Sequence, residues 1–492
     1  MLNAKHFPCA IMLLPLAIVD VNAETAQQDQ MVITAKAPVT EADFAGSVTT
    51  VTAEEIQLSG ATNILEAIQM VPGISVNSVS SQASGRNGIS IRGMENNHTL
   101  ILIDGRRISD TDTNVPFSDF QYNWVPLVAV ERIEVVRGPM SNLYGSSALG
   151  GVINIITTNA DKEWSTTVEA QLSKVDLGNG GDAKDFSLAT SGTLGDSVDL
   201  SFAIEQQDSD AFQNSFPSGS SANKEGKDSR NLILKAGFNI SENTRLGFNI
   251  VDSDDDRTQY PDTLSYTIKR NQTGLELSNS INGFDINTNI YRSTSDNDIE
   301  SQAYVHKLEE NVATVDLGGQ LNEQHFLTAG VEYSNEEYHK DYDSTSSFEF
   351  KDKFKSWSAF AQDRFDLSDE LTLTWGARYD DHQRFGNALS PKAYLNWDIS
   401  DAWQIKTGYG EGFKAPAVKD ASDAYNFEYT YPTAFGGPGG SPSAFQRNVF
   451  LGNSDLKEET SRTIEFGADY SQGKLNGGFT LFHSKVKDLI ST

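Results

Sequence analysis

From about Trp164 to its last residue, the chain consists of segments in which hydrophobic and polar positions alternate. Residues 200–204, 232–238, 371–378 and 403–408 are clear examples. A period of two places the apolar side chains of a β-strand on one face and the polar side chains on the other. Counting such segments, each roughly ten residues long, predicts about 15 or 16 antiparallel strands in this region.

The connections between these segments are of two kinds, tight turns such as 368–370 and 399–401 and long polar loops. Short turns at one end and long loops at the other are typical of transmembrane β-barrels. Aromatic residues cluster near strand ends, including Trp375 and Trp397, as a membrane interface requires. A row of soluble β-sandwich domains is the alternative, but no linker separates units of about 100 residues. We therefore expect a single all-β transmembrane barrel over residues 161–492.

Residues 41–160 have a mixed pattern. Residues 53–56 and 63–68 have helical character, whereas residues 99–105 and 133–139 are apolar strands that end at glycine-containing turns. Short β-branched runs fill the rest of the segment. The pattern predicts a compact α+β domain ahead of the barrel.

The N-terminus has the features of an export signal. Lys5 precedes an apolar stretch from Phe7 to Val19, and small residues lead up to Ala23, so we expect cleavage after Ala23 and a signal peptide at residues 1–23. An anchor helix is the alternative, but the apolar stretch is too short to span a bilayer. The sequence has one cysteine, Cys9, which lies in the predicted signal peptide. The mature chain is therefore predicted to have no disulfide and no thiol chemistry.

Residues 24–40 form a separate short segment. It is small and polar up to Gln30, then strand-like from Met31 to Ala35, and Pro38 stops any extension of that strand. Such a segment is predicted to be a detachable peptide in front of the α+β domain.

Charge and hydropathy narrow the classes of function. With 38 Lys and Arg against 68 Asp and Glu, the chain has a formal net charge of −30. This balance repels phosphate backbones and excludes nucleic acid as an expected partner. A mean hydropathy of −0.41 excludes a helical membrane protein but is compatible with a barrel, whose apolar residues occupy every second position.

Known catalytic patterns are missing from the sequence. There is no Gly-x-Ser-x-Gly motif, and the histidines lack the HExxH or HxxxH spacing of a catalytic metal site. A hydrolase, the alternative from a different class, therefore has no support in the sequence, and we expect no enzymatic activity and no permanently bound cofactor.

Several motifs resemble those of TonB-dependent outer-membrane receptors, in the right order along the chain. Ile91–Met94, Leu102–Gly105, Val130–Pro139 and Tyr144–Thr157 are similar to the family's plug domain. The residues that resemble the TonB box, through which the inner-membrane protein TonB pulls on such receptors, are Asp29, Gln30, Met31, Val32, Ile33, Thr34 and Ala35. Within the family, the sequence looks most like the colicin I receptor and ferric enterobactin receptor group.

The resemblance assigns a plug in the barrel lumen and a set of plug residues. These are Arg92, Gly93, Asp104, Gly105, Glu131, Arg132, Glu134, Arg137, Gly138, Pro139, Tyr144, Gly145, Gly150 and Gly151. We expect the three arginines and two glutamates to form ion pairs between plug and barrel wall, because a plug in a polar lumen must satisfy its charges there. Residues 145–151 are glycine-rich, but no Lys-Ser/Thr follows, so they predict a tight turn rather than a phosphate loop.

The ligand expected from the resemblance is a ferric siderophore of the catecholate class. Residues 412–416 and 452–460 resemble paired signatures that flank a large extracellular loop. The candidate ligand-binding residues are Arg86, Tyr425, Phe427, Tyr429, Tyr431 and Arg447. The aromatic residues are suited to stacking on catechol rings and Arg447 to an anionic iron complex, although a loop packed only on itself explains them equally well.

Haem and cobalamin are the competing ligands. Haem receptors that resemble this family place a histidine between the two signatures, and residues 417–451 contain none. For cobalamin, the acidic run Asp252, Asp254, Asp255 and Asp256 is expected to lie in a loop, where it is a candidate calcium site. A solvated charged surface is the simpler interpretation of this run.

The resemblance also implies partners and a location. It implies a monomeric multi-pass barrel in the outer membrane of a Gram-negative bacterium, in contact with lipid and coupled to TonB and its energising complex, with colicins or phages as candidate users of the loops. About 17 residues separate Ala23 from the plug, too few for the extra domain of a signalling receptor. The family closes its barrel with 22 strands, and residues 487–492 lack a terminal aromatic residue. We therefore expect a fragment lacking about the last quarter, which would not assemble as given.

Overall fold

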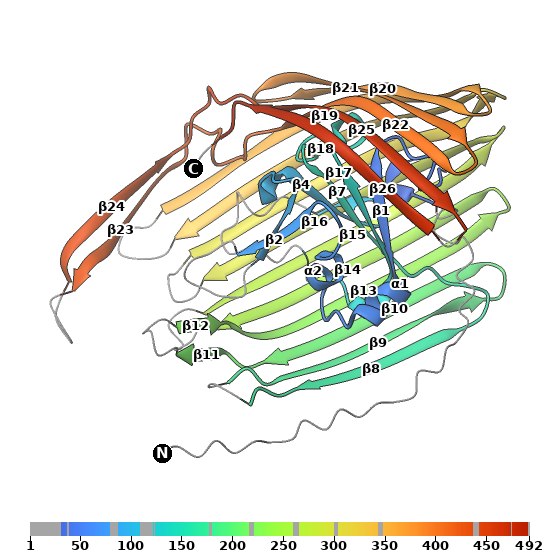
Figure 1. Ribbon diagram of the computed structural model, residues 1–492. Coiled ribbons are helices and arrows are strands. Elements are labelled where there is room, and N and C mark those ends of the chain that lie inside the picture. Colours follow the sequence, from blue (N-terminus) through green and yellow to red (C-terminus); the bar gives the residue numbers. More distant parts are fainter. Residues whose placement is uncertain are drawn as a thin grey trace, which may run out of the picture.

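The computed structural model describes residues 31–490 except 37–38, 79–86, 109–121, 123, 177–179, 216–220, 259–264, 300–303, 343–347, 436–441 and 474. Two parts make up the structure, a small α+β domain and a large curved sheet (Figure 1). Asp29, Gln30 and Arg86 lie outside the described residues. No described helix is long and apolar enough to cross a membrane.

The large sheet has 15 antiparallel strands and confirms the predicted barrel wall. Its strands follow chain order except where hairpins β11–β12 and β23–β24 are inserted. They are β8 (Ser165–Ser173), β9 (Ala183–Leu194), β10 (Val198–Ser209), β13 (Gly226–Ser241), β14 (Thr244–Thr258), β15 (Ser265–Ile281), β16 (Phe284–Ile299), β17 (Tyr304–Asn322), β18 (His325–Tyr342), β19 (Phe348–Ser368), β20 (Leu371–His382), β21 (Gly386–Ser400), β22 (Trp403–Lys414), β25 (Glu459–Gln472) and β26 (Leu475–Lys487). The inserted hairpins are β11 (Phe212–Ser215) with β12 (Ser221–Lys224) and β23 (Asn426–Phe435) with β24 (Pro442–Leu451).

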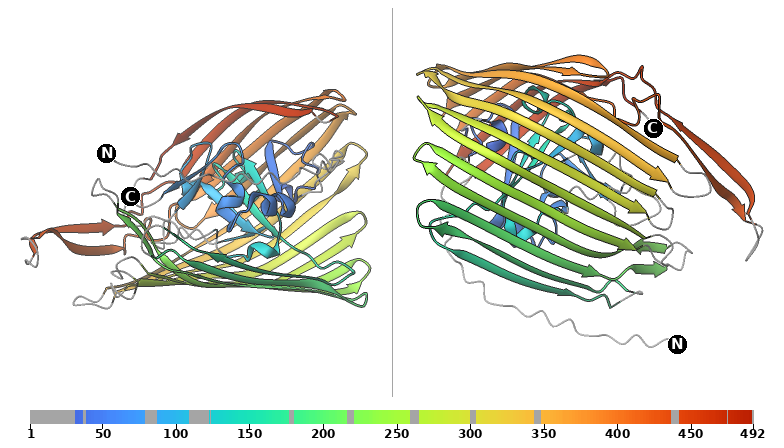
Figure 2. Two further views of the ribbon diagram at one scale, coloured as in Figure 1. Left: turned by 60° about the horizontal axis from the view of Figure 1, so that its bottom comes forward. Right: turned by 180° about the vertical axis from the view of Figure 1, so that it is seen from behind.

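Tight turns and long connections alternate along this sheet, as expected. Strands β15 and β16 pair up to Ile281 and Phe284, whereas β22 and β25 are separated by the segment that carries β23 and β24. The tight turns share one end of the sheet, here called the turn end, and the longer connections share the other, the loop end. Hairpin β23–β24 projects beyond the loop end in Figures 1 and 2.

The α+β domain lies in the concave side of the large sheet (Figure 2). It contains a five-stranded sheet in the order β1-β6-β7-β4-β5 and a separate β2–β3 hairpin. Its strands are β1 (Ser47–Thr52), β2 (Ile74–Ser78), β3 (Asn87–Ile91), β4 (Thr99–Ile103), β5 (Arg106–Arg107), β6 (Val130–Arg137) and β7 (Gly151–Thr157). Its helices are α1 (Ala53–Ser59), α2 (Ile64–Ile68), α4 (Ser141–Tyr144) and the 3-10 turns η1 (Ile33–Ala35), η2 (Asn96–His98) and η3 (Leu127–Ala129).

Local sequence explains where the two longer plug helices begin. Thr52 and Glu55 form a capping box, in which each side chain bonds the other's backbone N–H, and α1 ends at Gly60 in the left-handed conformation. Asn63 accepts a hydrogen bond from the backbone of Glu66 and so caps α2. Both helices lie where the sequence predicts helical character.

The five-stranded sheet separates two apolar cores, because side chains alternate between its faces. Ile101, Ile133 and Ile153 point to the face covered by α1 and α2, here called the helix-side core. Leu102 and Val152 point to the opposite face, where they pack with residues of the N-terminal segment in the box-side core. One sheet therefore supports two separate clusters, and each touches a different part of the wall.

Candidate functional site

The candidate site is the strand-like peptide Met31–Ala35, which lies against the box side of the five-stranded sheet. Val32 is 1% exposed and Ala35 5%, whereas Ile33 is 47% exposed. The peptide forms the 3-10 turn η1 instead of an extended strand. Val32 and Ala35 thus enter the box-side core and Thr34 is buried beside them, whereas Met31 and Ile33 are exposed.

Glu134 on β6 is the main acceptor for this peptide. Its carboxylate accepts hydrogen bonds from the backbone N–H of Ile33 at 3.1 Å and of Thr34 at 2.8 Å, and from the Thr34 hydroxyl at 2.6 Å. The Glu134 side chain is fully buried, and Arg132 Nε donates to it at 3.0 Å. A buried carboxylate is stable only when it is paired and hydrogen-bonded in this way.

Thr34 has two further partners on the same face. Asn154 donates its side-chain N–H to the Thr34 hydroxyl at 3.1 Å, and the Tyr144 hydroxyl donates to the Thr34 carbonyl at 3.1 Å. Burial raises the pKa of the Tyr144 phenol well above its ordinary value, and the nearby Glu134 charge adds to the shift. Tyr144 therefore remains protonated and keeps its role as donor. The N–H groups of Ile33 and Thr34 and the Thr34 carbonyl are thus all hydrogen-bonded to plug side chains and are not available to the sheet of another protein.

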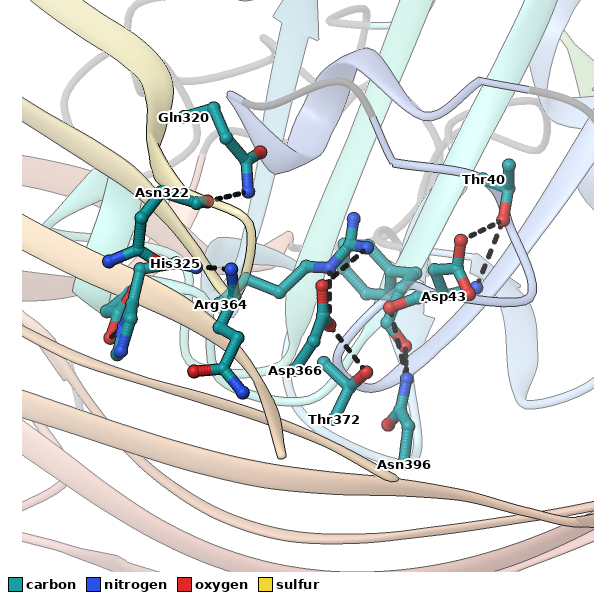
Figure 3. Close-up of polar contacts among 12 residues, drawn as sticks. Thr40, Asp43, Gln320, Asn322, His325, Arg364, Asp366, Thr372 and Asn396 are labelled. Atoms are coloured by element: carbon teal, nitrogen blue, oxygen red, sulfur yellow. Dashed lines mark hydrogen bonds and ion pairs between the residues drawn. The ribbon is translucent and has the colours of Figure 1, made fainter. Parts of the chain in front are cut away.

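Beyond the peptide, the N-terminal segment is tied to the wall of the large sheet. Lys36 forms an ion pair with Asp316 on β17 at 3.2 Å and lies 4.9 Å from the ring centre of Phe360 on β19. Thr40 and Asp43 bond each other, and Asn396 on β21 donates to the Asp43 carbonyl at 3.0 Å. Figure 3 shows this contact beside Arg364, Asp366 and Thr372 of the wall.

Glu41 is an ionisable group in the same segment. Burial raises its pKa to about 7, and the neighbouring charges of Lys406 and Arg137 only partly oppose the shift. The Lys406 ammonium donates to the Glu41 backbone carbonyl at 3.2 Å. Docking of the segment is therefore sensitive to the protonation of Glu41.

The expected ion pairs between plug and wall are only partly correct. Arg92 does cross to the wall and meets Glu465 on β25 at 2.7 Å. Arg132, however, pairs with Glu131 and Glu134 within the plug. Arg137 also stays within the plug and binds three oxygens of β1, those of Ser47, Val48 and Thr49. The expectation fails for Arg132 because this side chain shares the sheet face of Glu134, on which the peptide lies.

The remaining plug-motif residues shape turns around the sheet. Asp104 and Gly105 form the turn after β4 with positive φ, and the Asp104 carboxylate accepts from Thr157 and pairs with Lys235 on β13. Arg92 and Gly93 form a turn of the same kind after β3. Gly138, Pro139, Gly145 and Gly150 border the segment that carries α4. At Gly151 (φ +155°), a Cβ would lie 2.1 Å from the Val136 carbonyl, so only glycine fits.

A second polar contact joins the plug to the wall nearer the loop end. His98 Nε2 meets the Glu459 carboxylate, and both side chains are 2% exposed. Lys414 on β22 donates to the Asn97 carbonyl at 3.0 Å. Sequence reasoning missed these contacts, because nothing in the local pattern of residues 96–98 marks them as partners of β22 and β25.

Tyr425 and Phe427, two of the predicted ligand-binding aromatic residues, are buried rather than exposed as a surface. Tyr425 and Phe427 pack in a cluster with Tyr338, Phe350 and neighbouring residues at the loop end. The Lys340 ammonium lies 3.2 Å from the ring centre of Phe427 and donates to the Tyr425 hydroxyl at 3.2 Å. The expected stacking surface is thus not seen for these two residues. The side chains of Tyr429 and Tyr431 lie outside the described part.

The structure also places Arg447, a predicted ligand-binding residue, and the acidic run, the candidate calcium site. Arg447 is exposed and pairs with Glu428 across the β23–β24 hairpin. The acidic run lies on β14 and not in a loop, so this part of the prediction is wrong. Asp255 is buried and pairs with Arg257. Asp252, Asp254 and Asp256 lie together on the opposite face of β14, where they are partly or fully exposed. Among the described residues, no group of three acidic or histidine side chains is arranged to hold a metal ion.

Comparison with family models covers nearly the whole described chain. Residues 40–152 match the TonB-dependent Receptor Plug Domain, and residues 159–492 match the TonB dependent receptor-like, beta-barrel model.

The chain is also similar to individual proteins. An iron-regulated outer membrane virulence protein of Vibrio cholerae is 30% identical over 90% of this chain, and the ferrienterobactin receptor of Escherichia coli is 26% identical over 94%. The chain spans 66% and 71% of the length of these two relatives. Among solved structures, a ferric enterobactin receptor variant from Pseudomonas aeruginosa superposes with a TM-score of 0.79 at 23% identity, over 93% of this chain and 73% of that one. The last comparison supports the fold.

Proposed function

From the premise that the chain belongs to the TonB-dependent receptor family, we propose that the full-length protein is an energy-coupled outer-membrane importer of ferric siderophores. The family is one of receptors and transporters. Energy for import comes from TonB, so no nucleotide site and no catalytic residue is needed. The proposed ligand is a ferric siderophore of the catecholate class, and this choice is supported by the E. coli and P. aeruginosa relatives, which are receptors for ferric enterobactin.

The observation that carries this proposal is the state of the Met31–Ala35 peptide. It is held to the plug by hydrogen bonds from both of its central N–H groups to one carboxylate. When released, the same N–H groups and the Thr34 carbonyl are free to pair with the edge of a partner's sheet. A short peptide that alternates between these two partners is what coupling to TonB requires.

Charge at the loop end supports an anionic ligand. Lys340 contacts Tyr425 and Phe427, and Arg447, paired with Glu428, is exposed on the hairpin. Movement of this hairpin would uncover the Lys340 ammonium together with two aromatic rings, a combination that suits a ferric catecholate. Tyr429, Tyr431 and Arg86 remain proposed contacts.

Growth of an iron-starved receptor-deficient strain tests the proposal. The strain carries the full-length gene and is fed ferric catecholates, haem or cobalamin in turn. We expect rescue by a catecholate, lost with Ile33→Pro because proline removes an N–H that the partner's sheet needs. Ile33→Ala is the matched control and should retain rescue, since it keeps the backbone donor. Rescue only by haem or cobalamin would overturn the ligand assignment, and rescue by Ile33→Pro would overturn coupling through this peptide.

Processing and assembly belong to the same proposal. We propose that residues 1–23 are removed on export, so that mass spectrometry of the mature protein finds Glu24 at its N-terminus. A monomeric receptor whose loop end also serves colicins or phages follows from the family resemblance. Cross-linking in intact membranes should then give no ladder of receptor multimers.

A further inference from the structure

The wall divides where β22 approaches the loop end. Strands β21 and β22 pair as far as Lys392 opposite Gly410. Beyond this point β21 continues to Gly386 beside β20, whereas β22 continues to Lys414 beside β25. Over the described residues 411–414, β22 is therefore left without a strand on its β21 side. Buried backbone N–H groups there still need acceptors.

Plug side chains supply acceptors for this end of β22. The backbone N–H of Phe413 donates to the Ser141 hydroxyl at 3.2 Å, and that of Ala415 donates to the Ser146 hydroxyl at 3.0 Å. The two backbones come close together here, because a Cβ at Gly412 would lie 3.1 Å from the Ser141 hydroxyl oxygen. The plug thus does for the end of β22 what a neighbouring strand does elsewhere in the wall.

The plug also holds the two residues between which the inserted loop leaves the wall. Lys414 ends β22, and Glu459 begins β25 directly opposite it. The Lys414 ammonium donates to the Asn97 carbonyl at 3.0 Å, and His98 Nε2 lies 2.5 Å from the Glu459 carboxylate. The side chains of His98 and Glu459 are each 2% exposed, and a charge-assisted hydrogen bond is strong when water is excluded. Both ends of the loop are therefore fixed to the plug.

The first part of this loop, residues 415–425, is here called the strap. It leads from β22 to strands that are not neighbours of β22 in the sheet. Val418 and Ala421 are 1% exposed and share one apolar cluster with residues of β15 to β19. The Ser422 hydroxyl donates to the Asp352 carboxylate on β19 at 2.6 Å. The strap thus joins the end of β22 that the plug holds to another part of the wall.

The chain that returns from hairpin β23–β24 is bound to the strap. The backbone N–H groups of Gly452 and Asn453 donate to the carbonyls of Tyr425 and Asp420 at 2.9 and 2.7 Å. A Cβ at Gly452 would lie 1.9 Å from the Ser422 carbonyl oxygen, so only glycine fits. The strap and residues 452–458 therefore form one body, here called the strap unit. It carries hairpin β23–β24 beyond the loop end (Figure 1).

We propose that the plug positions the ligand-binding loop, so that the affinity for a ferric siderophore depends on plug side chains that act through the strap unit. The positioning residues are Asn97, His98, Ser141 and Ser146. They fix the strap unit at both of its ends, and the hairpin with the proposed ligand contacts is built on that unit. This inference rests on the proposed function and specifies what holds the binding loop in place.

Substitution of His98 tests the inference most directly. Its side chain makes the contact with Glu459, whereas its backbone carbonyl accepts from Gly150 and is kept in any variant. Binding of ferric enterobactin to the purified full-length receptor is measured by quenching of tryptophan fluorescence. For His98→Ala we expect about tenfold weaker binding, the size of one charge-assisted hydrogen bond. His98→Gln should bind nearly as the original does, because its amide keeps an N–H donor for Glu459.

Either of two results with these variants would overturn the inference. One is unchanged affinity in His98→Ala, and the other is an equal loss in both variants. Lys235→Ala is the matched control, since it breaks a plug-to-wall ion pair with Asp104 at 3.3 Å on β13. Among the described residues, β13 contributes none to the cluster of the strap. Affinity should therefore be unchanged, and a tenfold loss would mean that any weakening of the plug acts on the loop.

A double-mutant cycle asks whether His98 acts through Glu459. Glu459→Ala is made alone and together with His98→Ala, and the same binding measurement is repeated. Because the two side chains form one contact, the combined variant should lose no more affinity than the weaker-binding single variant. Losses that multiply would show two independent effects and would contradict the proposed link.

Hydrogen exchange tests the inference without any ligand. In His98→Ala, the amides of Phe413 and Ala415 should exchange faster, because one of the remaining attachments beside them is lost. The Ile153 amide, in the helix-side core, should be unchanged. Faster exchange at all three would mean a general loss of plug stability and would overturn the inference. If the unsubstituted receptor binds no ferric enterobactin, the proposed ligand fails, while this exchange pattern still decides whether the plug holds the loop.

Discussion

The two faces of the plug sheet differ in how they are covered, although the same strands form both. Two short helices and three wall residues cover one face in a continuous apolar cluster. Segment 31–45, α4 and Phe360 of the wall cover the other, and the segment is held there by side-chain bonds to Glu134 and Asn154. Neighbouring residues of one strand, such as Val152 and Ile153, therefore belong to regions with different attachments. Alternation along a strand thus places neighbouring residues on two faces of one sheet that are covered in different ways.

Among the substitutions that would alter the covering of the two faces, Glu134→Ala should have the largest effect. It leaves the N–H groups of Ile33 and Thr34 and the Arg132 guanidinium without their buried acceptor. Docking of the described residues of segment 31–45, here called the N-terminal layer, should weaken by about 3–5 kcal/mol, the usual cost of removing one partner of a buried charge pair. Hydrogen exchange of the Thr34 amide in the purified full-length receptor measures it. Glu131→Ala is the control, since Glu131 is 43% exposed and should change this exchange little.

Ile233→Ala acts on the opposite face. It removes a buried side chain from the contact between the helix-side core and β13, which typically costs about 2–4 kcal/mol. We expect faster exchange at the Ile153 amide and unchanged exchange at Thr34. Leu234→Ala, the next residue on the other face of β13, serves as control. Equal loss of protection at both amides would mean that the two faces do not behave separately.

A smaller effect is expected within the peptide itself. Val32→Ala removes buried apolar surface worth about 1–2 kcal/mol, whereas Ile33→Ala changes a side chain that is 47% exposed. Release of the layer, measured by proteolysis next to residue 31, should rise for Val32→Ala and remain near the original level for Ile33→Ala. The reverse order would contradict the orientation of the peptide seen here.

The smallest effect is a pH dependence that Glu41 introduces. Its pKa is about 7 in the docked layer, compared with 4.5 ordinarily, so the docked state binds the proton more tightly. Docking should be strongest below about pH 4.5, weaken as pH rises towards 7 and stay constant above that value. Glu41→Gln should flatten this part of the profile. An unchanged slope between pH 5 and about 7 in the variant would assign the dependence to another group.

Much of the fold follows from the sequence, because strand alternation is a local property. Apolar and polar residues alternate over residues 371–378, and the structure has strand β20 there. The placement of Asp252 to Asp256 in a loop failed, since β14 extends past its apolar part to Thr258. There both faces of the strand are polar, so no alternation marks it as a strand. Hydrophobic pattern alone therefore underestimates strand length at the loop end.

The candidate site was harder to predict than the fold. The peptide and Glu134 were each singled out from the sequence, but they are separated by 101 positions and nothing local joins them. Alternation on β6 predicts that Arg132 and Glu134 share a face, yet not which segment covers that face. The expected ion pairs therefore reached the wall only at Arg92. The burial of Tyr425 and Phe427 likewise depends on β18 and β19, far away in the chain.

The length of the N-terminal layer sets how far Met31 can be drawn out before β1 comes under load, once the contacts of the layer with β6 and β7 are broken. Roughly 15 residues lie between Met31 and Ala45, and an extended chain covers about 3.5 Å per residue, which gives a slack of about 50 Å. This slack exceeds the bilayer thickness of about 40–45 Å. The stroke of the coupling protein, rather than the strength of its grip, then decides whether β1 ever comes under load.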